Sequence, residues 1–555
     1  MSPARRVLTR LAVAAALLTG MASGCASTAA GDASSSALAP APQASEASRA
    51  PPLAPAGEEV FYHVFFRSFR DSDGDRIGDL RGMTESLDYL RELGITSILL
   101  TPLQPSPFYH NYFATDFESI EPAYGSMEDY TTFIRAAHAR GLKVYLDMEI
   151  QYVAEGHPWW TQSIGKPKAP HASYLLWRDA ARREAEPFLT QPKWEGYDGR
   201  WIGIAMVDMN SPQVRDYFRR VLLRWADPHG DGSGRDGPDG FRIDHVMDDL
   251  DNKGLATRLF DDFWKPIFDA LRERRPGFRI IAEQYDWGYG ADWLTRGHAD
   301  MVFAFPLRGA LVKLDKTEIA KALRETWRVT PTGKHQIVFM ENHDTDRSMS
   351  LFAGDPAKAR AAAAIMLLAK GEPLLYYGQE LGMRGITGKI GMSDANHIPL
   401  REAMRWQPDL QARGSATWYQ GDERWWTQRY NRSEDGVSVQ EQQDVPDSLL
   451  HWYQHLLALR QQRPELRRGT QQLPCPDGEP VLCLLRETDG QRTLLLVNLG
   501  DKQASARLEE GVAAQQWHRL DEGDTKAGAN RSEGADPAQP LPPYGVRILG
   551  GARTP

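Results

Sequence analysis

The sequence has little cysteine, no long apolar run beyond its N-terminal region and no dense cluster of basic residues. Three of 555 residues are cysteine, and the formal net charge is −9. Without a Lys/Arg-rich run after the N-terminus, the sequence lacks the electrostatic footprint of a nucleic-acid-binding protein. Hydrophobic residues make up 41% and charged residues 25%, which excludes wholesale disorder. We expect a folded, monomeric protein with no nucleic-acid partner.

The N-terminus has the pattern of a secretory signal. Three arginines precede the apolar run Leu11–Leu18, which is too short to span a membrane, and small residues follow it up to Cys25. The ending Ala-Ser-Gly-Cys resembles a bacterial lipobox, although Ala22 stands where leucine is commoner. This pattern predicts export across the inner membrane and a periplasmic or cell-surface lipoprotein anchored at Cys25. A plain cleaved signal with an incidental cysteine is the alternative.

From Val60 onward, apolar strand candidates alternate with segments of helical spacing, such as Ser126–Arg140, which Gly141 closes. Continuous apolar strands separated by helices are typical of parallel βα units with both sheet faces covered. The pattern predicts an α/β fold, a (β/α)8 TIM barrel, with an open doubly wound sheet as the alternative. The strand candidates are Val60–Phe66, Ile95–Leu100, Lys143–Ile150, Gly240–Asp244, Arg279–Glu283, Met301–Phe305, Gln336–Glu341 and Pro373–Tyr377.

Two regions depart from this alternation. The segment after the third strand is too long for an ordinary βα loop, which predicts an inserted small domain on the catalytic face. After a helix ending near Gln462, short strands and turns predict an all-β C-terminal sandwich domain. The expected segments are a signal peptide with lipobox (1–25), an Ala/Ser/Pro-rich linker (26–57), the first part of the barrel (58–151), the inserted domain (152–219), the second part of the barrel (220–464) and the C-terminal domain (465–555).

Cys475 and Cys483 flank the turn residues Pro476–Gly478 in this C-terminal region. In an oxidising compartment this spacing favours a disulfide that staples a hairpin, with two free thiols as the alternative.

Polar side chains stand where several predicted strands end. Asp147 ends the third strand, and Arg242 with Asp244 ends the fourth in the run GFRIDHV. Glu283 ends the fifth, and His343 with Asp344 follows the seventh. In a barrel these ends meet on one face. No His-rich ligand set accompanies the carboxylates, so acid/base and nucleophilic chemistry is favoured over a metal centre.

Acetal cleavage needs one ionised carboxylate and one protonated carboxylic acid. Arg242 keeps Asp244 ionised, while the apolar and aromatic neighbours of Glu283 raise the pKa of its carboxyl. These environments predict Asp244 as the nucleophile and Glu283 as the acid.

Seven motifs in order resemble the α-amylase superfamily, glycoside hydrolase family 13, in its branch of oligo-1,6-glucosidases, α-glucosidases and trehalose synthases. They are DSDGDRIGDLRG, SPFYHNYFATDF, GFRIDHV, IIAEQ, FMENHDTDR, LLYYGQELGM and IPLREAMRW, and the resemblance covers residues 60 to about 551. It implies a retaining mechanism with Asp244 as nucleophile, Glu283 as general acid/base and Asp344 as the third carboxylate. It implies substrate contacts by Arg242, His343, Tyr112, Asp147, Tyr152 and Arg401.

The resemblance also implies a structural calcium site at Asp71, Asp73, Asp75, Asp79 and the carbonyl of Ile77. Carboxylates alternating around a glycine turn suit the oxygen ligands that calcium prefers. A polar turn that caps the next helix is the alternative.

The sequence departs from the family pattern close to the expected site. Gln151 and Tyr152 replace the usual Asn and His, and His245 follows the nucleophile where relatives tend to have a smaller residue. We expect a hydrolase of α-1,4-linked glucans and maltooligosaccharides, with α-1,6 linkages left open. A trehalose synthase or transglycosylase is the first alternative, and a non-catalytic glucan-binding protein is the second.

Overall fold

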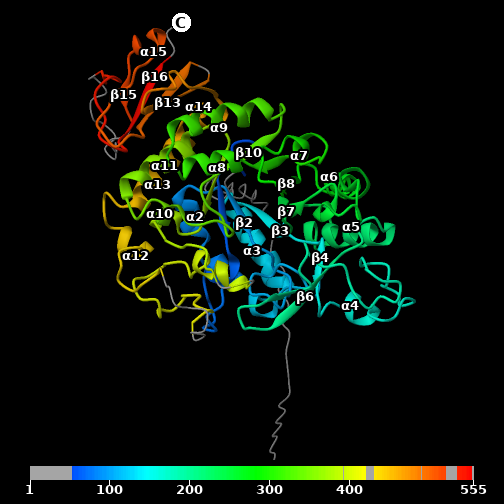
Figure 1. The fold of residues 1–555 in the computed structure, drawn as a ribbon. Coiled ribbons are helices and arrows are strands. Elements are labelled where there is room, and N and C mark those ends of the chain that lie inside the picture. The colour runs from blue at the N-terminus through cyan, green and yellow to red at the C-terminus, as the bar shows by residue number, and fades with distance from the viewer. Residues whose placement is uncertain are drawn as a thin grey trace, which may run out of the picture. The chain divides into compact units, whose positions relative to one another are not determined.

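The computed structural model of the chain describes residues 53–389, 391, 393–420, 430–488, 490–520 and 534–552 (Figure 1). The predicted signal, its Cys25 and nearly all of the predicted linker lie outside these residues. Among the described helices, none combines the length and the apolar character needed to cross a membrane.

Eight parallel strands close into a barrel in the order in which they occur along the chain, and β11 pairs with β1 (Figure 1). All eight strand predictions are confirmed, and the open-sheet alternative is wrong. The strands are β1 (Phe61–Val64), β2 (Ser97–Leu100), β3 (Lys143–Met148), β7 (Gly240–Val246), β8 (Arg279–Gln284), β9 (Met301–Phe303), β10 (His335–Phe339) and β11 (Glu372–Tyr376).

Buried side chains on the inner face of the strands fill the barrel, and Phe61, Tyr145, Phe303 and Phe339 are among them. The outer faces are covered by helices. Helix α3 begins as predicted, because Ser126 and Asp129 form a capping box at its N-terminus. The barrel helices are α1 (Leu80–Glu85), α2 (Leu87–Leu93), α3 (Met127–Ala139), α5 (Pro212–Ala226), α6 (Lys265–Arg274), α7 (Ala291–Thr295), α8 (Phe305–Leu311), α9 (Lys316–Val329), α10 (Ser348–Leu351), α11 (Pro356–Leu368), α12 (Val439–Gln442) and α13 (Leu449–Gln462).

A small sheet stands between β3 and α5, where the sequence predicts an insertion. Its strands β4 (Tyr152–Ala154), β6 (Trp201–Met206) and β5 (Lys193–Glu195) pair antiparallel in that spatial order, beside α4 (Pro158–Ser163) (Figure 1). Since β4 follows the exit of β3 by a few residues, this insertion reaches the end of the barrel where the predicted site residues gather.

The C-terminal region forms an antiparallel sheet in the order β12-β13-β14-β16-β15 (Figure 1). The Cys475–Cys483 disulfide that the sequence favours is present. Buried Arg486 donates to the carbonyl of Leu368 at the C-terminus of α11 (2.9 Å), which joins this sheet to the barrel. The elements are α14 (Pro464–Arg468), β12 (Thr470–Gln472), β13 (Val481–Thr488), β14 (Gln491–Asn498), α15 (Glu510–Ala513), β15 (His518–Arg519) and β16 (Val546–Ala552).

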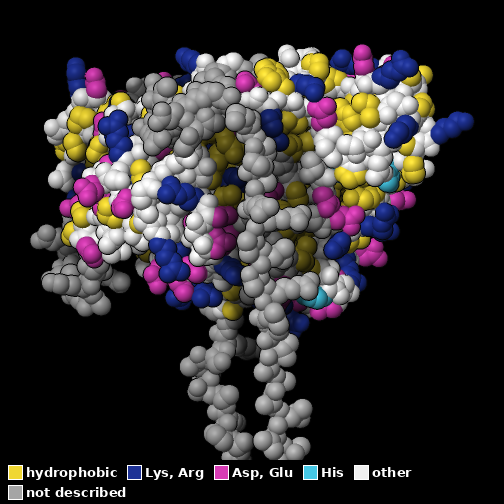
Figure 2. Space-filling view, turned by 90° about the horizontal axis from the view of Figure 1, so that it is seen from below, with side chains coloured by type: hydrophobic (Ala, Val, Ile, Leu, Met, Phe, Trp, Pro, Cys, Tyr) yellow, Lys and Arg dark blue, Asp and Glu magenta, His cyan; other side chains and the backbone are white. Residues whose placement is uncertain are grey.

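One face of the molecule, seen in Figure 2, carries basic and acidic side chains interspersed with one another. On this face the two signs of charge are not separated into large patches.

Candidate active site

Arg242 binds the carboxylates that end three neighbouring strands. Its guanidinium is buried, with 1% of the side chain exposed, and Nη1 lies 2.7 Å from Asp147 Oδ2 and 2.5 Å from Asp244 Oδ1. Nη2 lies 2.8 Å from Glu283 Oε2. Arg242 and Asp244 lie on the same side of β7 because strand side chains alternate. The structure therefore brings Asp147, Asp244 and Glu283 together around one cation.

The third predicted carboxylate, Asp344, follows β10 and is held by two basic side chains. His343 Nε2 lies 2.9 Å from Asp344 Oδ2, and Arg401 Nη2 lies 2.9 Å from Asp344 Oδ1. Arg401 also donates from Nε to the carbonyl of His343 (2.8 Å). Arg401 therefore contacts both the His343 carbonyl and the Asp344 carboxylate, and these two contacts fix the orientation of the segment that carries Asp344.

Tyr112 links the two groups of residues. Its hydroxyl donates to Asp147 Oδ2 (2.6 Å) and lies 2.9 Å from His343 Nε2. The Tyr112 and His343 rings stack with centroids 5.4 Å apart. The Tyr112 side chain is 7% exposed, so this contact sits within the wall of the site.

The surroundings separate the acidities of the carboxyl groups. Burial raises the pKa of Glu283 well above its usual range against the opposing charge of Arg242, and the charges of Asp244 and Asp344 with a hydrogen bond to Asp244 raise it further. Burial also raises the pKa of Asp147, to about 6. For Asp344, burial acts in the raising direction, but His343 and Arg401 lower its pKa well below the usual range. The site can therefore hold a proton on Glu283 beside an ionised Asp344.

Gln151 and Tyr152, two of the three residues that depart from the family pattern, bind the protein scaffold. Gln151 donates from Nε2 to the carbonyls of Asp244 and His245, the latter at 3.2 Å. Tyr152 is 1% exposed, and its hydroxyl donates to Asp251 Oδ1 (2.5 Å). The structure does not bring Tyr152 into hydrogen-bond contact with Asp244, Glu283 or Asp344. Gln151 instead supports the backbone where β7 is irregular and His245 has a φ of 48°.

Sequence reasoning missed three residues whose buried side chains support the site. Glu149 accepts backbone N–H groups of Phe113 (3.0 Å) and of Gln151 and Tyr152 (2.8 Å each), so it joins the Tyr112 loop to the exit of β3. Asp251 accepts from Tyr152, and His63 on β1 contacts His343. The position of Glu149 between the apolar residues Met148 and Ile150 could have indicated its role, because a buried carboxylate needs hydrogen-bond donors around it.

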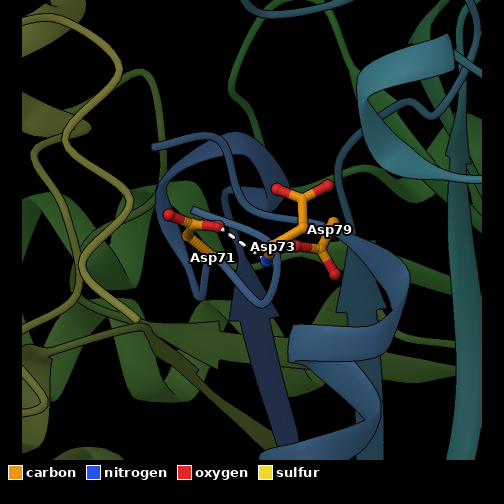
Figure 3. Close-up of side chains that lie close together, drawn as sticks. All are labelled: Asp71, Asp73 and Asp79. Carbon is orange, nitrogen blue, oxygen red and sulfur yellow. Dashed lines mark hydrogen bonds between the residues drawn. The ribbon is translucent and has the colours of Figure 1, made fainter. Parts of the chain in front are cut away.

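A separate acidic group lies on the loop from β1 to α1 (Figure 3). Asp71, Asp73 and Asp79 place one carboxylate oxygen each within 4.8 Å of the others. The predicted ligand Asp75 is not part of this group and accepts the backbone N–H of Ile77 (2.7 Å). Burial raises the pKa of Asp75, and the charges of Asp73, Asp71 and Asp79 act in the same direction. Oxygen atoms gathered in a negative field suit a hard cation.

Comparisons with known proteins agree with this architecture. Residues 63–469 match the family model of the alpha amylase catalytic domain, and residues 478–549 match that of the D-apionate lactonase C-terminal immunoglobulin-like domain. Alpha-amylase 3 of Dictyoglomus thermophilum is 29% identical over 79% of this chain and 84% of its own. Trehalose synthase/amylase TreS of Mycolicibacterium smegmatis is 28% identical over 78% and 80%. The crystal structure of alpha-amylase from H. orenii superposes with a TM-score of 0.71 at 26% identity, covering 89% of this chain and 99% of that one.

Tyr152→Phe separates the scaffold role seen in the structure from the sugar contact that the sequence predicts. Removing the hydroxyl leaves Asp251 with one donor fewer, so we expect the free energy of unfolding to fall by about 2 kcal/mol. We expect KM for maltotriose to change by less than about threefold, because the hydroxyl is already bound. Denaturant unfolding and steady-state kinetics measure the two effects. Unchanged stability with a KM raised tenfold or more would instead make Tyr152 a sugar ligand.

Proposed function

Because the chain belongs to the α-amylase family of glycoside hydrolases, we propose that it cleaves α-1,4-glucosidic bonds of glucans and maltooligosaccharides with retention of configuration. Its family membership makes it an enzyme, and the non-catalytic alternative is set aside. The observation that carries the proposal is the Arg242 guanidinium shared by Asp244 and Glu283. Because both carboxyl groups contact the same guanidinium, they lie close together, and a short separation of the two carboxyl groups favours a retaining mechanism over an inverting one.

In the proposed mechanism, Asp244 attacks the anomeric carbon while Glu283 gives its proton to the departing glycosidic oxygen. The raised pKa of Glu283 keeps that proton in place, and the Arg242 contact at 2.5 Å stabilises the charge of Asp244. Water then attacks the glycosyl-enzyme bond, and Glu283 takes the proton of that water. One water molecule is consumed for each glycosidic bond cleaved.

Asp344 binds hydroxyl groups of the same sugar in this proposal. Its two oxygens face His343 and Arg401, and its lowered pKa keeps it an acceptor. Tyr112 supplies an aromatic wall beside His343, and Asp147 holds the Tyr112 hydroxyl and Arg242 in place.

Maltose isomerisation is the second candidate, because a relative of similar identity is named a trehalose synthase/amylase. The same glycosyl-enzyme would serve it, with released glucose in place of water as the attacking group. The identities of these relatives leave α-1,6 cleavage open as well, since a probable oligo-1,6-glucosidase of Bacillus subtilis is 26% identical.

Product analysis distinguishes these activities. We expect maltoheptaose and soluble starch to yield shorter α-anomeric maltooligosaccharides and new reducing ends, measured by NMR of fresh products and by chromatography. If maltose is instead converted into trehalose and little glucose is released, the enzyme is an isomerase and not a hydrolase. Release of glucose from isomaltotriose would show that the enzyme also cleaves α-1,6 bonds. If the first products are β-anomers, the proposed retention of configuration is wrong.

Variants of the two carboxyl groups test their roles. Asp244→Asn should lower kcat/KM for maltotriose by roughly 10³-fold or more, because no covalent bond can form. Glu283→Gln should lower it by roughly 10²- to 10⁴-fold, yet still form the glycosyl-enzyme from α-glucosyl fluoride, whose leaving group needs no proton. Intact-protein mass spectrometry detects that adduct. Asp286→Asn, which removes an exposed carboxylate near Glu283, is the control. An active Asp244→Asn enzyme would refute the assignment.

We also propose a structural calcium ion at the acidic loop. The three clustered carboxylates of Asp71, Asp73 and Asp79 would hold it, and a cation there would neutralise their mutual repulsion. The ion would fix the loop that leads from β1 into α1.

Calcium should therefore stabilise the protein. Saturating Ca²⁺ should raise the melting temperature by about 5 °C over protein treated with chelator, because a ligand that binds only the folded state stabilises by mass action. Asp73→Asn should abolish the difference, whereas Asp88→Asn on α2, paired with Arg140, should keep it. Equal melting temperatures of wild type with calcium and with chelator would exclude the site.

We further propose that the mature protein is a monomer held at the membrane by lipid on Cys25, with export to the periplasm or cell surface. The Ala-Ser-Gly-Cys sequence supports the lipid anchor and the export. In a bacterial host fed labelled palmitate, wild type should carry label and sediment with membranes, whereas Cys25→Ser should do neither. If the wild-type protein carries no label, the lipid anchor is refuted and the N-terminus is a plain cleaved signal.

A further inference from the structure

His63, on strand β1, lies directly behind the site. Its Nε2 is 3.1 Å from Nδ1 of His343, and the two rings stack with centroids 5.1 Å apart. Both side chains are about 1% exposed, and His63 Nδ1 has no hydrogen-bond partner. Two histidines in direct contact can share only one proton between the facing nitrogens. The other partners of each ring therefore decide which nitrogen carries it.

The opposite nitrogen of His343 faces two acceptors. Nε2 lies 2.9 Å from Asp344 Oδ2 and 2.9 Å from the Tyr112 oxygen. The Tyr112 proton is already donated to Asp147 Oδ2 (2.6 Å), so the Tyr112 oxygen offers a lone pair to His343. Nε2 must then carry a proton. In a neutral ring Nδ1 is left as an acceptor, and that acceptor needs a donor.

His63 is placed to be that donor. When its Nε2 carries the proton, its unpartnered Nδ1 is a lone pair, which is less costly to bury than an unpartnered N–H. Burial lowers the pKa of His63 well below its usual range, and the positive charges of Arg242 and Arg401 add to this effect against the opposing charge of Asp344. The ring of Tyr376 packs edge-on against the His63 ring. His63 is thus a neutral ring.

We propose that His63 is a positioning residue that donates its Nε2 proton to Nδ1 of His343 and so fixes the proton of His343 on Nε2, facing Asp344. Without that donor, the His343 proton can move to Nδ1 and a nitrogen lone pair would face the Asp344 carboxylate. The consequence for catalysis rests on the proposed role of Asp344 in binding sugar hydroxyls, whereas the position of the proton does not.

The position of the proton is read by ¹⁵N NMR of protein labelled at histidine, with the His343 signals assigned by their loss in His343→Gln. We expect wild-type His343 to be protonated at Nε2 and bare at Nδ1. His63→Leu should populate the Nδ1-protonated form, and His63→Gln, whose amide can donate, should restore the wild-type pattern. A proton on Nδ1 of wild-type His343, in a neutral or a charged ring, overturns the proposal even if His63→Leu does not fold.

Kinetics on maltotriose give the functional readout. His63→Leu should lower kcat/KM by roughly 10- to 100-fold, and His63→Gln should recover most of this loss. His157→Leu, which removes a buried histidine that caps α4, should leave both kcat/KM and the His343 signals unchanged. A rate loss in His63→Leu with the His343 proton still on Nε2 would overturn the positioning role. A wild type without activity on any glucan would instead refute the proposed function, and the NMR result would still stand.

Discussion

The buried guanidinium of Arg242 is the interaction on which the site depends. One positive charge contacts three carboxyl groups, Asp147, Asp244 and Glu283, on three neighbouring strands. A single cation cannot compensate three carboxylates, so protons are retained on the two that are buried, Asp147 and Glu283, as their raised pKa values indicate. The barrel brings the three carboxyl groups together. Because only one positive charge compensates them, a buried carboxyl group retains its proton.

A second constraint acts from the opposite side of the site. Arg401 and His343 both contact Asp344, and the lowered pKa of Asp344 contrasts with the raised pKa of Glu283. Tyr112 connects the two sides through Asp147 and His343. In the proposed mechanism the site therefore combines an ionised group that binds sugar hydroxyls with a protonated group that acts as the acid, and both protonation states follow from the partners of each carboxyl group.

The barrel could be predicted from the sequence because buried parallel strands are continuous apolar runs such as Ile95–Leu100, and because their polar ends converge on one face. The carboxylates Asp244, Glu283 and Asp344 were found by that rule. The orientation of Tyr152 toward Asp251 could not be predicted, since the two residues are 99 positions apart and meet only when the insertion folds onto the loop after β7. The contact of His63 with His343 spans 280 positions and depends on barrel closure. The separation of Asp75 from the other acidic side chains depends on the local turn.

The pH dependence of kcat/KM tests most directly the claim that Glu283 holds a proton because of its surroundings. A carboxyl group with a raised pKa keeps its proton to higher pH, so activity that needs this proton is lost as pH rises through that pKa. With maltotriose, kcat/KM should fall at alkaline pH, well above the ordinary range of glutamate. With α-glucosyl fluoride the alkaline fall should be absent, because fluoride leaves without a proton. The same alkaline fall for both substrates, or a fall already near the usual pKa of glutamate, would contradict this account.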